Sequence, residues 1–199
     1  MDRKMLFKIH MCDHNSESIW NKEFFCDILF YKSEFSEVNK MDSEVSFRYA
    51  ERNDVALILR FIKELADYEK MLNEVVADEK TLEEWIFDKQ KAEVVFALED
   101  SKEVGFALFF HNFSTFLGKA GIYLEDLYVR PEYRGKGYGK AILKKLASIA
   151  VERGCGRLEW WCLDWNKPSI DFYLSLGAEP MSDWTVYRIA GDTLLNLAE

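Results

Sequence analysis

The fold of this chain is decided by the stretch Arg130-Pro131-Glu132-Tyr133-Arg134-Gly135-Lys136-Gly137-Tyr138-Gly139-Lys140. Before it comes an apolar run over residues 122–129 with the character of a β-strand, and after it comes a helical pattern over residues 141–151. The turn between them holds three glycines and several cations. Backbone N–H groups at a helix N-terminus, together with positive charge, form a binding site for phosphate. We therefore predict that this turn binds a phosphate group.

Two common phosphate-binding motifs do not fit the turn. A P-loop reads G-x-x-x-x-G-K-[ST], and a dinucleotide-binding fingerprint reads G-x-G-x-x-G. Counted from Gly135, both motifs require a glycine at the position of Lys140. The pattern that remains is R-G-x-G-x-G from Arg134 to Gly139, in which the glycines let the backbone approach a pyrophosphate. A turn made basic only for solubility is the alternative, and the flanking strand and helix favour the binding site.

Length, charge and cysteine content exclude several classes of protein. The chain has 199 residues and a net charge of −9, which suits one domain and disfavours nucleic acid as a partner. It contains no apolar run of about 18 residues, so we expect no membrane span. The four cysteines form no C-x-x-C pair, which predicts a reduced, cytoplasmic protein. The alternating His10, Cys12 and His14 lack a fourth ligand, and we predict no metal site.

The apolar periodicity predicts a mixed sheet of the α/β (α+β) class in one domain. We assign the domain to residues 41–199 and leave residues 1–40 as an N-terminal extension of unknown role. Strands are expected at 43–49, 93–98, 104–111, 122–129, 157–163 and 185–189. Helices are expected at about 54–70, at 81–89 behind a capping box that begins at Thr81, from 141 to about 153, at 169–176 and from 192. Residues 99–102 are expected to form a hairpin turn and residues 112–119 a loop.

The stretch Leu127–Gly139 resembles the acetyl-CoA signature of the GNAT N-acetyltransferase superfamily, Q/R-x-x-G-x-G/A after a strand. The resemblance implies a GNAT-type fold, a strand splayed at the cofactor site, and acetyl-CoA as donor with its pyrophosphate on the turn. The residues then expected to bind acetyl-CoA are Leu127, Tyr128, Val129, Arg134, Gly135, Lys136, Gly137, Tyr138, Gly139, Lys140, Asn166, Lys167, Pro168 and Ser169.

A narrower resemblance covers the chain from Val45 onward. Residues 62–69, 123–127 and 165–173 are similar to the diamine (spermidine/spermine) N1-acetyltransferase family. That similarity implies a small cationic amine as acceptor and a homodimer, with a polyamine or diamine as the leading expectation. Thialysine, another lysine-like amino acid or a protein amine is the alternative, and a non-catalytic CoA-binding module is a further one. The loop over residues 179–183 is shorter than the family's, which leaves the preferred acceptor length open.

Acetyl transfer to an amine requires a base for the ammonium and an acid for the departing thiolate. The resemblance implies that Tyr173 is the acid and that Tyr68 and Glu69 contact the acceptor. Glu125 and Asp126 are adjacent on a strand and would point to opposite faces unless a bulge re-aims one of them. We assign Glu125 as base and acceptor ligand, and Asp126 as ligand of a second amine.

A covalent route through cysteine is not expected. Cys155 and Cys162 show no base partner in the sequence, so we interpret both as packing residues. Direct attack of the amine in a ternary complex is the mechanism we predict.

Overall fold

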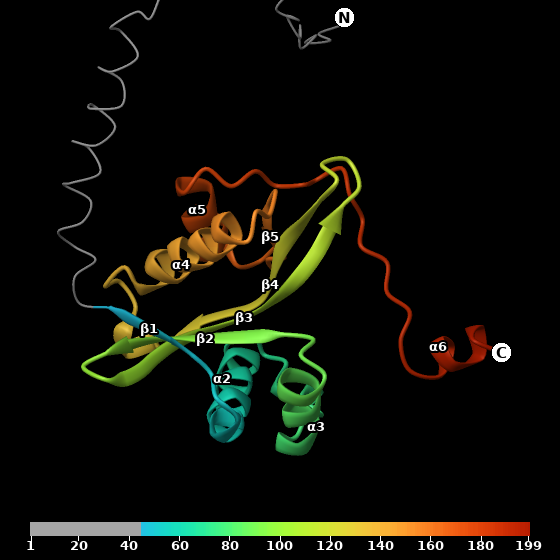
Figure 1. Ribbon diagram of the computed structural model, residues 1–199, viewed down its shortest axis with the longest axis horizontal. Coiled ribbons are helices and arrows are strands. Elements are labelled where there is room, and N and C mark those ends of the chain that lie inside the picture. The colour runs from blue at the N-terminus through green and yellow to red at the C-terminus, as the bar shows by residue number, and fades with distance from the viewer. Residues whose placement is uncertain (1–44) are drawn as a thin grey trace, which may run out of the picture. The chain divides into compact units, whose positions relative to one another are not determined.

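The computed structural model describes residues 45–199, which fold around a five-stranded sheet. The strands follow the order of the chain: β1 (Ser46–Tyr49), β2 (Glu93–Glu99), β3 (Lys102–Ser114), β4 (Lys119–Val129) and β5 (Leu158–Trp160). The first four pair antiparallel, and β5 joins β4 in parallel. This mixed sheet confirms the predicted class (Figure 1).

Helices cover both faces of the sheet. Figure 1 shows α2 (Val55–Tyr68) and α3 (Glu79–Glu83) on one side, and α4 (Tyr138–Glu152) and α5 (Lys167–Ser175) on the other. A last helix, α6 (Asp192–Leu197), follows near the C-terminus. Short 3-10 turns lie at Arg52–Asp54, Leu72–Glu74 and Pro131–Tyr133.

The main aromatic core lies between α2 and the sheet. Val55, Ile58 and Phe61 are buried on one stripe of α2, as their helical spacing predicts. The Phe61 ring stacks on Phe106 with the two centroids 5.0 Å apart, and it lies 5.8 Å from the Phe96 ring. Burial of these rings fixes α2 against β2 and β3, because each aromatic side chain removes a large apolar area from water.

The predicted hairpin between β2 and β3 is confirmed. Asp100 and Ser101 both have positive φ angles, of 49° and 64°. Two such residues make the tight connection whose twist matches that of antiparallel strands. The following loop is shorter than expected, because β3 continues to Ser114 and β4 begins at Lys119.

The helix expected at 81–89 has a different start and a different geometry. Asp78, and not Thr81, is its N-cap, and the Asp78 carboxylate accepts a hydrogen bond of 2.7 Å from the Thr81 amide. The prediction of a capping box that begins at Thr81 is therefore wrong. After Glu83 the helix widens to a π-helix over Glu84–Asp88.

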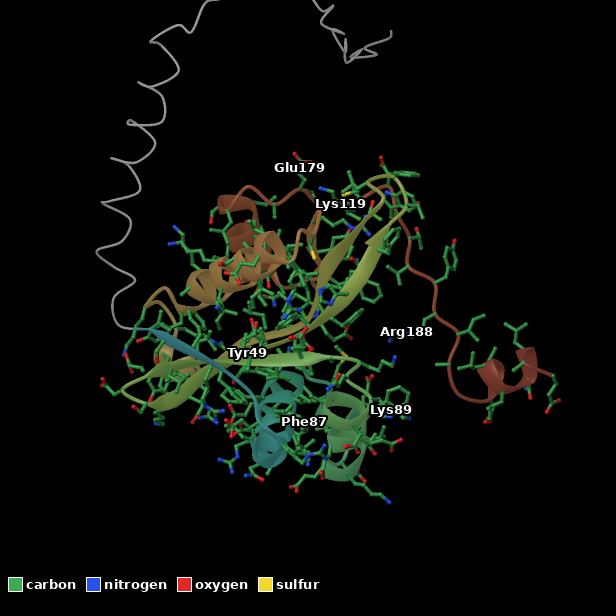
Figure 2. The ribbon with its side chains drawn as sticks, in the orientation of Figure 1. Tyr49, Phe87, Lys89, Lys119, Glu179 and Arg188 are labelled. Atoms are coloured by element: carbon green, nitrogen blue, oxygen red, sulfur yellow. The ribbon has the colours of Figure 1, made fainter. Side chains whose placement is uncertain are left out.

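The strand predicted at Thr185–Ile189 is wrong for this chain taken alone. These residues have no strand partner, and the segment from 179 to 199, which we call the C-terminal arm, is exposed throughout. Alternating apolar residues form a strand only where a sheet edge accepts their hydrogen bonds. The arm runs clear of the sheet in Figure 1, and Figure 2 shows Arg188 reaching back toward the body of the domain. The Arg188 guanidinium lies 6.0 Å from the Trp161 ring centroid.

Several expectations fall on residues that the structure leaves undescribed. These are the domain start at residue 41, the N-terminal extension, and the group of His10, Cys12 and His14. The domain boundary stays a prediction. Between residues 45 and 199, no helix is both long and apolar enough to cross a membrane.

Candidate active site

The strands β4 and β5 separate beside the glycine turn. They pair only over Ile122–Leu124 and Leu158–Trp160, whereas β4 continues for five more residues to Val129. The strand expected to splay at the cofactor site therefore does so. The side of β4 that would face β5 beyond Leu124 is left for a ligand, which is where the pantetheine arm of acetyl-CoA is expected.

The glycine turn has the backbone geometry of an anion site. Gly135 and Gly137 have φ angles of 78° and 90°, and Gly137 is the N-cap of α4. Residues that carry a side chain rarely adopt such positive φ angles, so glycine is needed at both positions. A Cβ built at either glycine would meet no atom within 4 Å, so the space above the turn is open. Amide groups at the start of α4 therefore have room for the pyrophosphate of acetyl-CoA, and the residues fit that donor.

Polar contacts hold the turn against the sheet. Lys136 and Tyr138 both bind Glu99 at the end of β2, with the lysine pair at 2.8 Å. At the other side of the turn, Arg130 makes two bonds to Glu64 of α2, at 2.9 and 3.0 Å. These contacts fix where the turn lies relative to α2 and β2.

Arg134 links the turn to the end of α2. Its Nε donates to the Val129 carbonyl at 2.9 Å. Its guanidinium lies 4.7 Å from the Tyr68 ring centroid and 5.3 Å from that of Tyr128. A guanidinium between two aromatic faces is held by cation–π attraction. Arg134, the first residue of the signature, is thus held in place by Tyr68. Tyr68 is the residue that the resemblance leads us to expect in contact with the acceptor.

The start of α5 is tied to the same tyrosine. Asn166 is buried, and its Oδ1 caps the helix by accepting from the Ser169 amide at 3.4 Å. The same oxygen accepts from the Tyr68 hydroxyl at 3.2 Å. Pro168 lies in the first turn as predicted, and Lys167 forms an ion pair with Asp171. The cap therefore sets the position of α5, which carries Tyr173, relative to α2.

A β-bulge lies at the paired acids on β4, which is the condition under which one of them can be re-aimed. Leu108 packs on the core beneath α2, whereas Phe109 lies beneath the end of α4. Their partners on β4 are Asp126 and Leu124, and Glu125 is the extra residue between them. The bulge thus turns Asp126 to the α2 side, although regular alternation would place it on the same side as Leu124.

Asp126 lies in a group of acids. It is half-buried, and burial, followed by the charges of Glu125 and Glu69, raises the pKa of its carboxyl to about 7. Burial also raises the pKa of Glu69, which follows the last residue of α2. Glu125, assigned as base from the sequence, is exposed. Carboxylates close together favour a bound cation, because it relieves their mutual repulsion.

Tyr173 closes the group from α5. Its ring lies 5.0 Å from Trp160 and 5.4 Å from Phe172, centroid to centroid. Burial first, and then the neighbouring Cys162, Glu69 and Tyr68, raise the pKa of the Tyr173 hydroxyl to about 12. The phenol therefore keeps its proton at neutral pH, which is the form that an acid needs.

Cys162 is a poor nucleophile in this setting. Burial raises the pKa of its thiol, and the charges of Glu69 and Asp164 raise it further. A thiol held in its protonated form does not attack a thioester readily. Cys155 and Cys162 are both free thiols. Over residues 45–199, no group of three or more His, Cys, Asp or Glu side chains is arranged to bind a metal ion.

The structure adds two residues that the sequence reasoning missed. The Trp165 ring lies 6.2 Å from Tyr68, and the Lys70 ammonium lies 5.9 Å from the Trp165 centroid. Both are exposed at the edge of the acid group. Neither belongs to a catalytic motif, and only the contacts of Trp165 with Tyr68 and with Lys70 mark them.

With this geometry in place, a comparison with known proteins decides the family. Residues 59–178 match the family model described as the acetyltransferase (GNAT) family. The chain belongs to the GNAT family of acetyltransferases. Its sheet is therefore the GNAT sheet, and GNAT acetyltransferases use acetyl-CoA as donor.

Two relatives and one solved structure are informative. The thialysine N-epsilon-acetyltransferase of Bos taurus is 39% identical over 77% of this chain and 97% of its own length. The spermidine/spermine N(1)-acetyltransferase-like protein 1 of Homo sapiens is 36% identical over 76% of this chain and 23% of its own length. An integron cassette protein from the mobile metagenome of V. cholerae has a TM-score of 0.66, with 30% identity over 78% of this chain and 98% of that one.

Proposed function

We propose that this GNAT enzyme transfers the acetyl group of acetyl-CoA to the side-chain amine of a small lysine-like amino acid of the thialysine type. The observation that carries the proposal is the similarity to the bovine thialysine acetyltransferase, which spans 97% of that enzyme. A similarity over nearly the whole relative includes its acceptor side as well as its donor side. The polyamine that the sequence favoured becomes the second candidate.

The acid group and Lys70 suit the two ends of such an acceptor. Glu69, Asp126 and Glu125 offer negative charge to the ammonium that is to be acetylated. Lys70, held beside Trp165, offers a cation to an α-carboxylate. A linear polyamine has no carboxylate, and its second ammonium would meet the charge of Lys70. An amino acid is therefore the better match in charge at both ends.

Each part of the reaction then has its residues. Residues 134–140 hold the pyrophosphate, and the backbone of Leu127 and Val129 holds the pantetheine arm. Acetyl-CoA supplies the thioester. A carboxylate of the bulge takes a proton from the acceptor's ammonium, and Tyr173 gives a proton to the departing sulfur. Transfer is direct, because the raised pKa of Cys162 disfavours a covalent route.

The proposal includes a homodimer in the reducing cytoplasm. α5 contains no fully buried residue, and the C-terminal arm exposes Trp184, Val186, Tyr187 and Ile189. Exposed apolar surface of this extent is typical of an interface. The free thiols of Cys155 and Cys162 fit a reducing compartment.

A polyamine acceptor is the second candidate, and the carboxylate group is the observation that favours it. Three acids near one another suit a dication, and the human spermidine/spermine-like relative is 36% identical over three quarters of this chain. The two candidates differ in the charge that the far end of the acceptor carries.

An acceptor panel separates these candidates. Thialysine, lysine, ornithine, spermidine and spermine would each be offered with radiolabelled acetyl-CoA, using wild type, Lys70→Glu and the control Lys63→Glu. Lys63 is exposed on α2, which ends two residues before Lys70. We expect kcat/KM for thialysine to exceed that for spermidine about tenfold or more, since one charge contact is worth roughly 1.4 kcal/mol or more. Lys70→Glu should reduce this ratio, and Lys63→Glu should preserve it.

Other outcomes of the panel would reject the proposal. Spermidine turnover above that of every amino acid would establish the polyamine reading. Binding of acetyl-CoA without transfer to any amine would instead show a non-catalytic CoA-binding module.

A further inference from the structure

The β-bulge on β4 gives its two acids different positions and different exposure to solvent. Asp126 opposes Leu108 and points to the α2 side, and Glu125 is the extra residue that has no partner on β3. Asp126 is half-buried, whereas Glu125 is exposed. The two neighbouring carboxylates therefore stand in different surroundings, since one is partly buried and the other is open to solvent.

The Asp126 carboxylate has no partner of its own. Within residues 45–199, its oxygens form no hydrogen bond and no ion pair with another side chain. The buried side-chain atoms that lack a hydrogen bond in this part of the chain are Asn112 Oδ1 and Arg157 Nε, and no oxygen of Asp126 is among them. The oxygens of Asp126 are therefore still reached by solvent, and a bound acceptor could contact them. A buried structural carboxylate would instead be hydrogen-bonded or paired.

Acidic and neutral groups surround Asp126, and no cation is among its electrostatic neighbours. Glu125 lies on its own strand and Glu69 follows the last residue of α2, and both charges disfavour ionisation of Asp126. From α5, Tyr173 interacts with Glu69, and Cys162, which follows β5, interacts with Glu69 as well. Tyr173 stays neutral near pH 7, because the pKa of its hydroxyl is raised. A carboxylate in such surroundings holds a proton more tightly than one in water.

We propose that Asp126, and not Glu125, is the general base that takes the proton from the acceptor's ammonium. This inference rests on the proposed acetyltransferase function. A general base works best when its pKa lies near the working pH. Much of it is then ionised, and the ionised form still has a strong driving force to take a proton. The pKa of about 7 for Asp126 meets that requirement.

The step balances in protons and electrons. The ammonium of the acceptor gives one proton to Asp126, which later releases it to solvent. The nitrogen lone pair forms the C–N bond to the acetyl carbon, and the C–S bond breaks with its electron pair on sulfur. Tyr173 gives its proton to that sulfur. The second proton that nitrogen loses returns through solvent to Tyr173, so each turnover releases one proton in total.

The test is the pH dependence of kcat/KM for thialysine, or for the best acceptor of the panel, between pH 5.5 and 9. Wild type should lose activity as the pH falls through about 7, because Asp126 becomes protonated there. Asp126→Asn should lower the rate about 100-fold or more and abolish this acidic limb. Glu125→Gln should keep the limb but shift it to lower pH, because the substitution removes one of the charges that raise the pKa of Asp126.

A second acceptor separates proton removal from other roles. Canaline, the aminooxy analogue of ornithine, carries a reacting nitrogen that is uncharged at neutral pH and needs no base. The loss of rate in Asp126→Asn at pH 7.5 should therefore be at least about tenfold smaller with canaline than with ornithine. Acetyl-CoA affinity, measured by calorimetry, should equal that of wild type.

The opposite results would overturn the assignment. An Asp126→Asn variant that retains the wild-type acidic limb, or a Glu125→Gln variant that lacks it, shows that Asp126 is not the base. The second variant decides the question even where the first does not fold. The proposed function fails separately, because wild type would then acetylate no amine of the panel.

Discussion

The acid and the base of the proposed reaction differ in the protonation state that each must hold. Burial raises both pKa values, to about 12 for Tyr173 and to about 7 for Asp126. The phenol then stays protonated over the whole working range, whereas the carboxyl exchanges its proton near neutrality. Pairs of groups whose surroundings separate their proton affinities are the usual mark of an acid and a base.

Tyr173→Phe should lose turnover while it keeps the donor site. We expect kcat to fall about 100-fold or more, because a general acid contributes roughly that much. The ring would keep its contacts with Trp160 and Phe172, so stability and acetyl-CoA affinity should change little. Stopped assays and calorimetry measure these quantities. Tyr187→Phe, on the exposed C-terminal arm, is the matched control. A Tyr173→Phe enzyme with wild-type kcat would remove the acid role.

The capping residue of α5 shows how one element couples two parts of the site. Asn166 Oδ1 accepts from the Ser169 amide within α5 and from the Tyr68 hydroxyl of α2. Tyr68 in turn lies beneath Arg134 of the glycine turn. The helix that carries Tyr173 is thus placed against both the acceptor side and the donor side. An N-cap usually stabilises one helix, whereas Asn166 caps α5 and also binds the last residue of α2.

Removal of two different N-caps should separate stability from activity. Asn166→Ala and Asp78→Ala should each cost about 1 kcal/mol in the free energy of unfolding, because each exposes amides at a helix start. Only Asn166→Ala should also lower kcat/KM, since α3 carries no site residue. Urea denaturation and steady-state assays measure the two effects. Equal activity in the two variants would contradict the coupling through Tyr68.

The C-terminal arm carries many of the exposed apolar side chains found within residues 45–199. Trp184 and Tyr187 are 69% and 89% exposed, although their surroundings in the sequence have the alternation of a strand. Within one chain, β5 at the edge has only three residues, and no described edge pairs with the arm. A second copy of the chain would supply both the apolar cover and the hydrogen-bonding edge that the arm lacks.

A chain that ends at Ala178 should therefore be a monomer. We expect the full chain to elute as a dimer in size-exclusion chromatography with light scattering, and the shortened chain to have the mass of one shortened protomer. Val76→Ser removes a 94% exposed apolar side chain outside the arm, and this control should remain a dimer. Dimers of the shortened chain would show that the arm is not the interface.

The two ends of the site differ in how far they could be predicted. Arg134 to Gly139 was predictable, because backbone approach to a phosphate demands glycines at fixed spacing and a helix directly after them. The bulge at Glu125 was foreseen only as a condition under which the acids could share a face. Lys70 and Trp165 were not foreseen, since a lysine and a tryptophan far apart in sequence carry no signal until the fold brings them together.

The sequence by itself determined the class of the fold, the glycine turn and the capped helix that carries Tyr173, because these depend on local patterns: strand, glycine turn, helix and a capped second helix. Tertiary structure alone decided which acid of β4 is partly buried, since that depends on a register shift against β3. It also decided that Thr185–Ile189 forms no strand in a single chain. Hydrogen-bond partners and burial come from segments distant in sequence, so a local pattern cannot specify them.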